Sequence, residues 1–129
     1  MATDRVVLDA SAAINASIVD GWAALNSWRL TAPTLLWSEA AAAIRQLAYR
    51  GELTAAEERS ALERLLAAPV EAVASSQLVR EALDLARDLG WAKTYDAEYI
   101  VLARRLDAAF LTRDRRLAAI AARYVRLAV

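Results

Sequence analysis

The sequence predicts an α/β domain with a mostly parallel sheet. Short apolar runs alternate along it with longer segments in which apolar residues recur at helical spacing. The connections between them are short, and several helical segments begin at a capping residue or end at a glycine or proline. Such alternation is typical of a parallel sheet covered by helices. With 129 residues the chain has the length of one domain, which we expect to span residues 1–129.

Each expected element has its own signal. Thr54 and Glu57 have the spacing of a capping box, and Gly51, Pro69 and Gly90 each follow a helical segment. We interpret the apolar runs at 6–8, 34–36, 70–73, 109–112 and 124–127 as strands. Helices are expected at 10–16, 20–28, 38–50, 54–68, 75–89, 95–106 and 114–122, with caps that include Asp20, Ser75, Thr94 and Asp114.

Four carboxylates, Asp9, Glu39, Asp96 and Asp114, stand where apolar runs meet helix starts. Asp9 and Asp114 directly follow two expected strands, and the other two fall in the first turns of expected helices. Ligands of parallel sheets bind outside the carboxyl ends of the strands, so all four carboxylates are expected at one edge. Each of them taken alone is better explained as a helix cap or as a first-turn residue that complements the helix dipole.

The composition excludes most catalytic devices. The chain has no histidine and no cysteine, which removes the serine–histidine triad, the cysteine nucleophile and histidine-dependent ribonuclease chemistry. Three glycines are too few for a phosphate-cradling or dinucleotide-binding loop. Asp9 is followed by Ala10 and Ser11, so the second aspartate of an aspartyl-phosphate phosphatase is missing.

Gathered carboxylates favour a divalent cation. Four like charges at one sheet edge raise one another's pKa values unless a cation compensates them. Oxygen ligands without imidazole or thiolate suit Mg²⁺ or Mn²⁺ and argue against zinc. Such an ion assists phosphodiester hydrolysis, in which Glu39 or Asp96 would help to deprotonate or position the attacking water.

The charge pattern is balanced overall and biased locally. Sixteen basic and sixteen acidic residues give a net charge of zero, which argues against broad, non-specific nucleic-acid binding. Arg113, Arg115 and Arg116 nevertheless crowd around Asp114, and arginine suits bidentate phosphate contacts. A solvated surface position explains each of these arginines equally well, and the same holds for Lys93.

The ordered motifs resemble a PIN-domain ribonuclease, and most of all a VapC toxin of the type II VapBC toxin–antitoxin family. The segments that carry the resemblance are Val6–Ser11, Leu36–Ala40, Tyr95–Ile100 and Leu111–Leu117, and their order and spacing extend over essentially the whole chain. The resemblance implies a PIN-like three-layer α/β/α sandwich. It also implies a metal-dependent endoribonuclease that hydrolyses RNA phosphodiester bonds.

The same resemblance assigns roles to residues and partners. Asp9, Glu39, Asp96 and Asp114 would be the acidic quartet that holds Mg²⁺ or Mn²⁺, with Ser11 and Thr112 as supporting hydroxyls. Arg113, Arg115 and Arg116 would contact RNA phosphates. Glu98 is left out because two residues along a helix turn it away from Asp96. The family further implies a homodimer and a VapB-type antitoxin whose tail lies in an apolar groove.

Alternatives remain at this stage. The chain would be a catalytically inactive PIN-like scaffold if the quartet bound no metal, or a plain α/β interaction domain if the acids were only caps. Trp22, Trp28, Trp37 and Trp91 suit either the core or an interface. We expect a cytoplasmic protein without a membrane segment, since no apolar stretch approaches the roughly 18 residues needed to span a bilayer.

Overall fold

The computed structural model describes residues 4–128. Its centre is a four-stranded, all-parallel sheet in the order β3-β2-β1-β4. The strands are β1 (Arg5–Leu8), β2 (Arg29–Pro33), β3 (Val70–Val73) and β4 (Ala109–Leu111). The helices are α1 (Ala10–Ile18), α2 (Leu35–Tyr49), α3 (Ala55–Leu66), α4 (Ser76–Leu89), α5 (Tyr95–Arg105) and α6 (Arg115–Ala121), with a 3₁₀ helix η1 (Trp22–Leu25).

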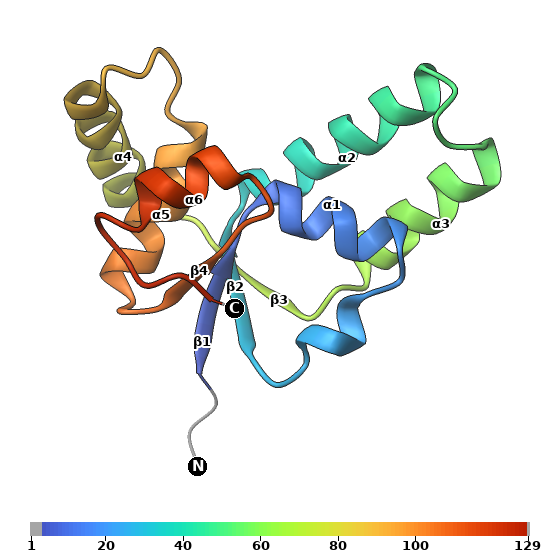
Figure 1. Ribbon diagram of the computed structural model, residues 1–129, viewed down its shortest axis with the longest axis horizontal. Coiled ribbons are helices and arrows are strands. Elements are labelled where there is room, and N and C mark those ends of the chain that lie inside the picture. Colours follow the sequence, from blue (N-terminus) through green and yellow to red (C-terminus); the bar gives the residue numbers. More distant parts are fainter. Residues whose placement is uncertain (1–3, 129) are drawn as a thin grey trace.

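The helices form two layers around the sheet. Figure 1 shows α1, α2 and α3 on one side of the strands and α4, α5 and α6 on the other. Every strand-to-strand pairing is parallel, so each strand requires a crossover and the helices cover both faces. The three-layer α/β/α architecture with a parallel sheet that the sequence predicts is thereby confirmed.

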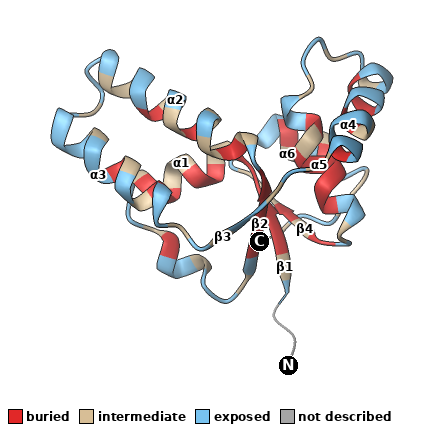
Figure 2. Cartoon of the chain, turned by 180° about the vertical axis from the view of Figure 1, so that it is seen from behind, coloured by how far each residue is buried: buried red, intermediate tan, exposed pale blue. Residues whose placement is uncertain are grey.

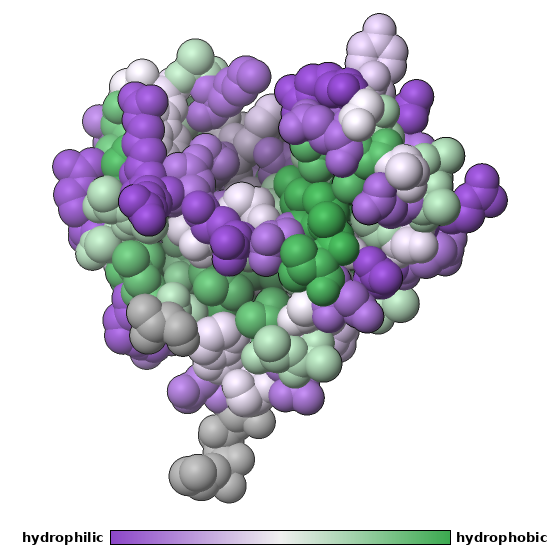
Figure 3. Space-filling model, turned by 45° about the vertical axis from the view of Figure 1, so that its right-hand side comes forward, coloured by the Kyte–Doolittle hydropathy of each residue, from purple (hydrophilic) through white to green (hydrophobic). Residues whose placement is uncertain are grey.

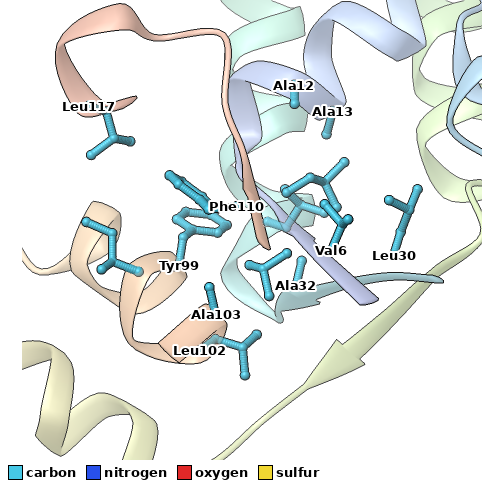
Figure 4. Close-up of a cluster of buried hydrophobic side chains, with 14 of the residues drawn as sticks. Val6, Ala12, Ala13, Leu30, Ala32, Tyr99, Leu102, Ala103, Phe110 and Leu117 are labelled. Carbon is cyan, nitrogen blue, oxygen red and sulfur yellow. The ribbon is translucent and has the colours of Figure 1, made fainter. Parts of the chain in front are cut away.

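The core lies between the sheet and both helical layers. Val6, Val7 and Leu8 are at most 1% exposed, which is expected of a central parallel strand buried on both faces. Helix faces turned toward the sheet are buried and the opposite faces are exposed (Figure 2). Tyr99 of α5 and Phe110 of β4 belong to the same buried cluster (Figure 4). The site described below therefore stands on a rigid support.

Several expected caps are present. Thr54 and Glu57 form a complete capping box, in which each side chain accepts from the other residue's backbone N–H. Ser75 accepts from the backbone N–H of Leu78, and Gly90 ends α4 in the left-handed conformation at φ 71°. Thr94 precedes α5 as expected, but its side chain makes no capping hydrogen bond.

Two expected elements are wrong in position or kind. The 20–28 helix is only the short η1, because Asp20 adopts a left-handed turn at φ 56° and Gly21 precedes the helix. No strand is found at 34–36, and the strand in this part of the chain is β2, which ends at Pro33. Leu35 and Leu36 instead open α2, so Glu39 lies in the second turn of that helix and not in the first. A short apolar run fits either structure, and here its neighbours decide.

The final expected strand is reduced to one bridge. Residues 124–127 form no strand, although Leu127 pairs with Phe110 as an isolated parallel bridge beside β4. Two backbone hydrogen bonds, from Phe110 N–H to Arg126 and from Ala128 N–H to Phe110, hold this segment. Among residues 4–128, no helix is both long and apolar enough to cross a membrane.

Candidate functional site

Asp9 lies where β1 becomes α1, and it is almost fully buried. Its backbone N–H donates to the carbonyl of Leu111 at 3.1 Å, which extends the pairing of β1 with β4 by one step. Its side chain caps α1 by accepting from the backbone N–H of Ala12 at 3.1 Å. Only 4% of the residue is exposed, so its carboxylate is held at the carboxyl edge of the sheet.

Two hydroxyls complete the surroundings of Asp9. Ser11 donates to Oδ1 at 2.7 Å, and Thr112 donates to Oδ2 at 2.6 Å. The same hydroxyls accept backbone N–H groups, Ser11 from Arg113 at 2.9 Å and Thr112 from Asp114 at 3.1 Å. Each carboxylate oxygen of Asp9 therefore has a partner, and the loop after β4 is fixed to the start of α1.

Asp114 follows that loop and caps α6. Its Oδ1 accepts the backbone N–H groups of Arg116 and Leu117, each at 3.0 Å. The capping interpretation is thus correct for Asp9 and Asp114. Capping does not remove Asp114 from the site, because its residue is exposed and lines the cleft described next.

The other three acidic residues line a single cleft of about 600 Å³. Glu39 of α2, Asp96 of α5 and Asp114 line it. The remaining lining residues come from the loop between α4 and α5, from the start of α5 and from α6: Gly90, Trp91, Ala92, Lys93, Tyr95, Arg116, Leu117 and Ile120. Asp96 lies in the first turn of α5, as expected, but α5 follows α4 and not a strand. The α4–α5 pair, not a strand-to-helix turn, brings Asp96 to the cleft.

Glu39 is oriented by a buried tyrosine. The hydroxyl of Tyr99, which is 0% exposed, donates to Glu39 Oε1 at 2.6 Å. Burial and the hydrogen bond to Glu39 raise the pKa of Tyr99 above its ordinary value of 10.0, so the phenol remains a donor. This bond connects α5 to α2 across the cleft.

The acidic residues are close enough to perturb one another. Burial raises the pKa of Asp9, and this effect outweighs its three hydrogen bonds, which lower the pKa. Burial also raises the pKa of Glu39, and the charges of Asp96 and Asp9 add to it. The pKa of Asp96 is raised by burial and then by the charges of Asp9 and Asp114. All four carboxylates thus share one electrostatic environment, which a cation would stabilise.

The donor set fits a hard cation that retains water. The titratable groups that face the cleft are three carboxylates together with Lys93, Tyr95 and Arg116, and imidazole and thiolate are absent from the sequence. Within residues 4–128, however, no three acidic side chains form a ready-made ligand cluster. Magnesium requires no such cluster, because it is usually held by one or two carboxylates together with waters and substrate oxygens.

Comparison with known proteins shows the family. The model of the PIN domain family matches residues 6–123. The chain is 37% identical over 114 residues to VapC ribonuclease Mb0985 of Mycobacterium bovis, covering 87% of each chain. The same identity and coverage relate it to Ribonuclease VapC9 of Mycobacterium tuberculosis. The chain belongs to the PIN-domain family. The similarity also bears out its resemblance to the VapC proteins.

A solved structure agrees with this assignment at the level of the fold. Protein PAE2754 from Pyrobaculum aerophilum superposes with a TM-score of 0.76 over 98% of this chain and 89% of that one, at 23% identity. The sheet and the two helical layers of this PIN domain are therefore shared by a distantly similar sequence.

Other candidate residues lie at different distances from the cleft of this PIN domain. Arg116 lines it, whereas Arg113 and Arg115 are exposed nearby and are not lining residues. Lys93, expected as a surface residue, is exposed and also lines the cleft. Glu98, which the sequence argument left out, lies within the electrostatic reach of Glu39, whose charge adds to burial in raising the pKa of Glu98.

The four tryptophans have different surroundings. Trp22 is 8% exposed, and its Nε1 donates to Ser17 at 3.2 Å, so it belongs to the core. Trp28, Trp37 and Trp91 are half-buried against the core. Of the four, only Trp91 lines the cleft.

Tyr99 is the residue of this PIN domain that sequence reasoning missed. It follows Asp96 by three residues, so both side chains lie on one face of α5. A tyrosine at that spacing from a candidate ligand was the available signal. It was hidden because an aromatic residue in an apolar helix is ordinarily a core residue, which Tyr99 also is.

Proposed function

We propose that this protein is a VapC-like endoribonuclease that hydrolyses RNA phosphodiester bonds with Mg²⁺ or Mn²⁺. The observation that carries the proposal is the shared electrostatic environment of Asp9, Glu39, Asp96 and Asp114 beside one cleft. The relatives named as ribonucleases support the reaction class. In this proposal the same four carboxylates hold the ion.

In this proposal each residue has a role that follows from its surroundings. Asp9, held by Ser11 and Thr112, provides a fixed negative charge at the sheet edge. When bound, the ion would supply Lewis-acid stabilisation of the charge that develops on the phosphoryl oxygens. Asp96 and Glu39 face the cleft and would position and deprotonate the attacking water. Tyr99 restricts Glu39 to one orientation for that task.

Basic residues beside the acids would hold the RNA. Arg116 lines the cleft, and Arg113 and Arg115 are exposed on the same loop and helix start. Within residues 4–128 none of the three forms an ion pair with an acidic side chain, so their charges are available to phosphates.

Cleavage of RNA by the purified protein tests the proposal. With Mg²⁺ or Mn²⁺ present, the wild type should cut structured RNAs. Asp9→Asn and Asp96→Asn should each lose this cutting by about 10³-fold or more, since each removes a charge from the proposed metal site. Both variants should keep the fold, because asparagine can still cap α1 and the side chain of Asp96 makes no hydrogen bond within residues 4–128. Full activity in either variant would contradict the site assignment.

A catalytically inactive binding domain is the second candidate. The lack of a ready-made cluster of three acidic side chains among residues 4–128 is compatible with it, whereas the intact quartet speaks against it. Thermal melting separates the two candidates, because an ion that binds only the folded protein raises the melting temperature by mass action. A rise at millimolar Mn²⁺ in the wild type, absent in Asp96→Asn, supports the enzyme. No rise in the wild type supports the scaffold.

We also propose that a VapB-type antitoxin neutralises the protein, that the protein is a homodimer, and that it acts in the cytoplasm. An apolar groove of about 470 Å³ between α2 and α3, lined in part by Ala41, Ile44 and Leu62, offers a seat for an antitoxin tail. Figure 3, in which the side carrying α2 and α3 comes forward, shows a band of apolar surface between hydrophilic side chains.

Sedimentation tests the proposed homodimer. It should give twice the 14.1 kDa mass of one chain, and a monomer at all concentrations would exclude the dimer.

A further inference from the structure

The α4–α5 loop and the first residue of α5 each place an aromatic side chain in the acidic cleft. Trp91 and Tyr95 both line the cleft together with Asp96 and Asp114. Tyr95 is 52% exposed, a large fraction for an aromatic residue, and Trp91 is half-buried. The chemistry proposed above uses neither ring, so their presence in the cleft has no explanation yet.

Both rings are attached to fixed backbone. Trp91 is the second residue after α4, and its N–H donates to the carbonyl of Ala86 at 2.8 Å while Gly90 turns the chain at φ 71°. This is the hydrogen-bond pattern that closes a helix through a left-handed glycine. Tyr95 is the first residue of α5. The two aromatic positions are therefore set by helix ends.

Two basic side chains line the same cleft as these rings. Lys93 is in the same loop, and Arg116 reaches the cleft from α6. Neither side chain is ion-paired to an acidic residue within residues 4–128. The cleft thus combines groups that match the parts of a nucleotide. Aromatic faces can stack on a base, the two cations can bind phosphates, and the three carboxylates would serve the proposed reaction.

We propose that Trp91 and Tyr95 form a stacking subsite for an unpaired nucleobase next to the bond to be cut, with Lys93 and Arg116 holding the adjoining phosphates. The inference rests on the proposed function and names its substrate class, which is single-stranded RNA or an unpaired loop. A base inside a duplex has both faces covered by its neighbours and offers none to a protein ring.

Stacking and charge explain together how a neutral protein binds RNA. Stacking of a base on an aromatic side chain contributes about 1–3 kcal/mol and tolerates any base. The net charge of zero gives little general attraction, so local aromatic contacts would supply affinity that overall charge does not. The subsite therefore selects for lack of pairing and not for a particular base.

The test compares three short RNAs of matched length by fluorescence anisotropy, in metal-free buffer so that nothing is cut. The first RNA is single-stranded. The second is the same strand with one abasic position, which is moved along the strand from one measurement to the next. The third is a duplex. The wild type should bind the single strand at least about tenfold more tightly than the duplex. One abasic position should weaken binding by about tenfold.

Variants assign the effect to the rings. Tyr95→Ala and Trp91→Leu should weaken binding of the intact strand by about tenfold and leave binding of the abasic strand unchanged. Trp91→Phe, which keeps a ring, should retain most of the wild-type affinity. This variant also tests the proposal if Trp91→Leu folds poorly. Tyr49→Ala is the matched control, since Tyr49 is an exposed tyrosine at the end of α2, 83% exposed and outside the cleft. Lys93→Gln should weaken both strands equally and reduce the salt dependence by about 0.7 of a unit slope.

The outcomes distinguish the subsite from the enzyme. Equal binding of duplex and single strand, no abasic effect, no binding of the single strand, or equal losses in Tyr95→Ala and Tyr49→Ala would each overturn the subsite. Cleavage is measured separately with Mg²⁺ or Mn²⁺. Ring-dependent binding of unpaired RNA without any cleavage would support the subsite and refute only the proposed hydrolysis.

Discussion

Asp9 and Asp96 belong to one candidate site, yet the fold surrounds them in opposite ways. Asp9 is buried and accepts hydrogen bonds from two hydroxyls and one backbone N–H. Asp96 is exposed on the cleft wall, and its side chain accepts no hydrogen bond within residues 4–128. The first carboxylate is built into the structure and the second is free to bind. The carboxylates of the proposed quartet therefore differ in their surroundings.

The difference also answers whether these acids are caps or site residues. Asp9 and Asp114 each cap a helix and also add their charge to the environment of Asp96. Capping fixes a carboxylate oxygen at a helix start, and the helices that directly follow parallel strands start at the edge where ligands bind. The two roles are compatible, and the structural role gives the chemical role its position.

Truncation of the two aspartates should show the largest contrast. Asp9→Ala should lower the free energy of unfolding by about 2–3 kcal/mol, because it removes the cap of α1 and leaves Ser11 and Thr112 without their acceptor. Asp96→Ala should change it by less than about 0.5 kcal/mol. Urea denaturation of both variants measures the difference. Equal losses would mean that Asp96 has a structural role that its contacts do not show.

The hydroxyls around Asp9 should account for much of that stability. Thr112→Val keeps the shape of the side chain and removes the bond to Asp9 and the acceptor of the Asp114 N–H. We expect a loss of about 2 kcal/mol in urea denaturation, since one partner is a buried carboxylate. Thr112→Ser retains the hydroxyl and is the control. Unchanged stability in Thr112→Val would contradict the role of the hydroxyl, and a loss in Thr112→Ser would measure the separate contribution of the methyl group.

Tyr99→Phe should affect ion binding more than folding. The ring remains in the core, but Glu39 loses the hydrogen bond that orients it. Partners that orient a metal ligand typically contribute about 10- to 100-fold in affinity, so we expect Mn²⁺ to bind about tenfold more weakly by titration calorimetry. Tyr124→Phe, at a half-buried tyrosine outside the cleft, is the control. Unchanged Mn²⁺ affinity in Tyr99→Phe would remove Glu39 from the proposed ligands.

The smallest effect is a pH dependence of stability without metal. The pKa of Asp96 is raised above its ordinary value of 3.8 by burial and by the charges of Asp9 and Asp114. The folded protein therefore holds this proton more tightly than the unfolded chain does, and stability falls as pH rises through the interval above 3.8. Asp96→Asn should raise the melting temperature at neutral pH and leave it unchanged below pH 3.8. A gain that is the same at both pH values would contradict the electrostatic cause.

How far the sequence predicts the molecule depends on how local each signal is. β1 and the caps at Thr54, Ser75 and Asp114 are determined by neighbouring residues and were correctly predicted. β2 was misplaced, because Leu35 and Leu36 suit a helix as well as a strand and only the pairing with β1 and β3 decides.

The site shows the same limit. The nearness of Asp9 to Asp114 follows from two adjacent parallel strands, which the sequence indicates. Asp96 was expected at the cleft for a reason that does not hold, since α5 follows a helix. The Tyr99–Glu39 bond joins residues 60 positions apart, and no local pattern encodes such a contact.

The bond from Thr112 to Asp9 spans 103 positions of the chain, and this separation has a consequence in time. During synthesis, β1 and α1 emerge first, and Asp9 can cap α1 long before β4 exists. Thr112 and Asp114 follow only with the loop after β4. A growing chain thus carries an incomplete acidic site until that loop has left the ribosome. The acidic site therefore cannot assemble before translation of the chain is almost complete.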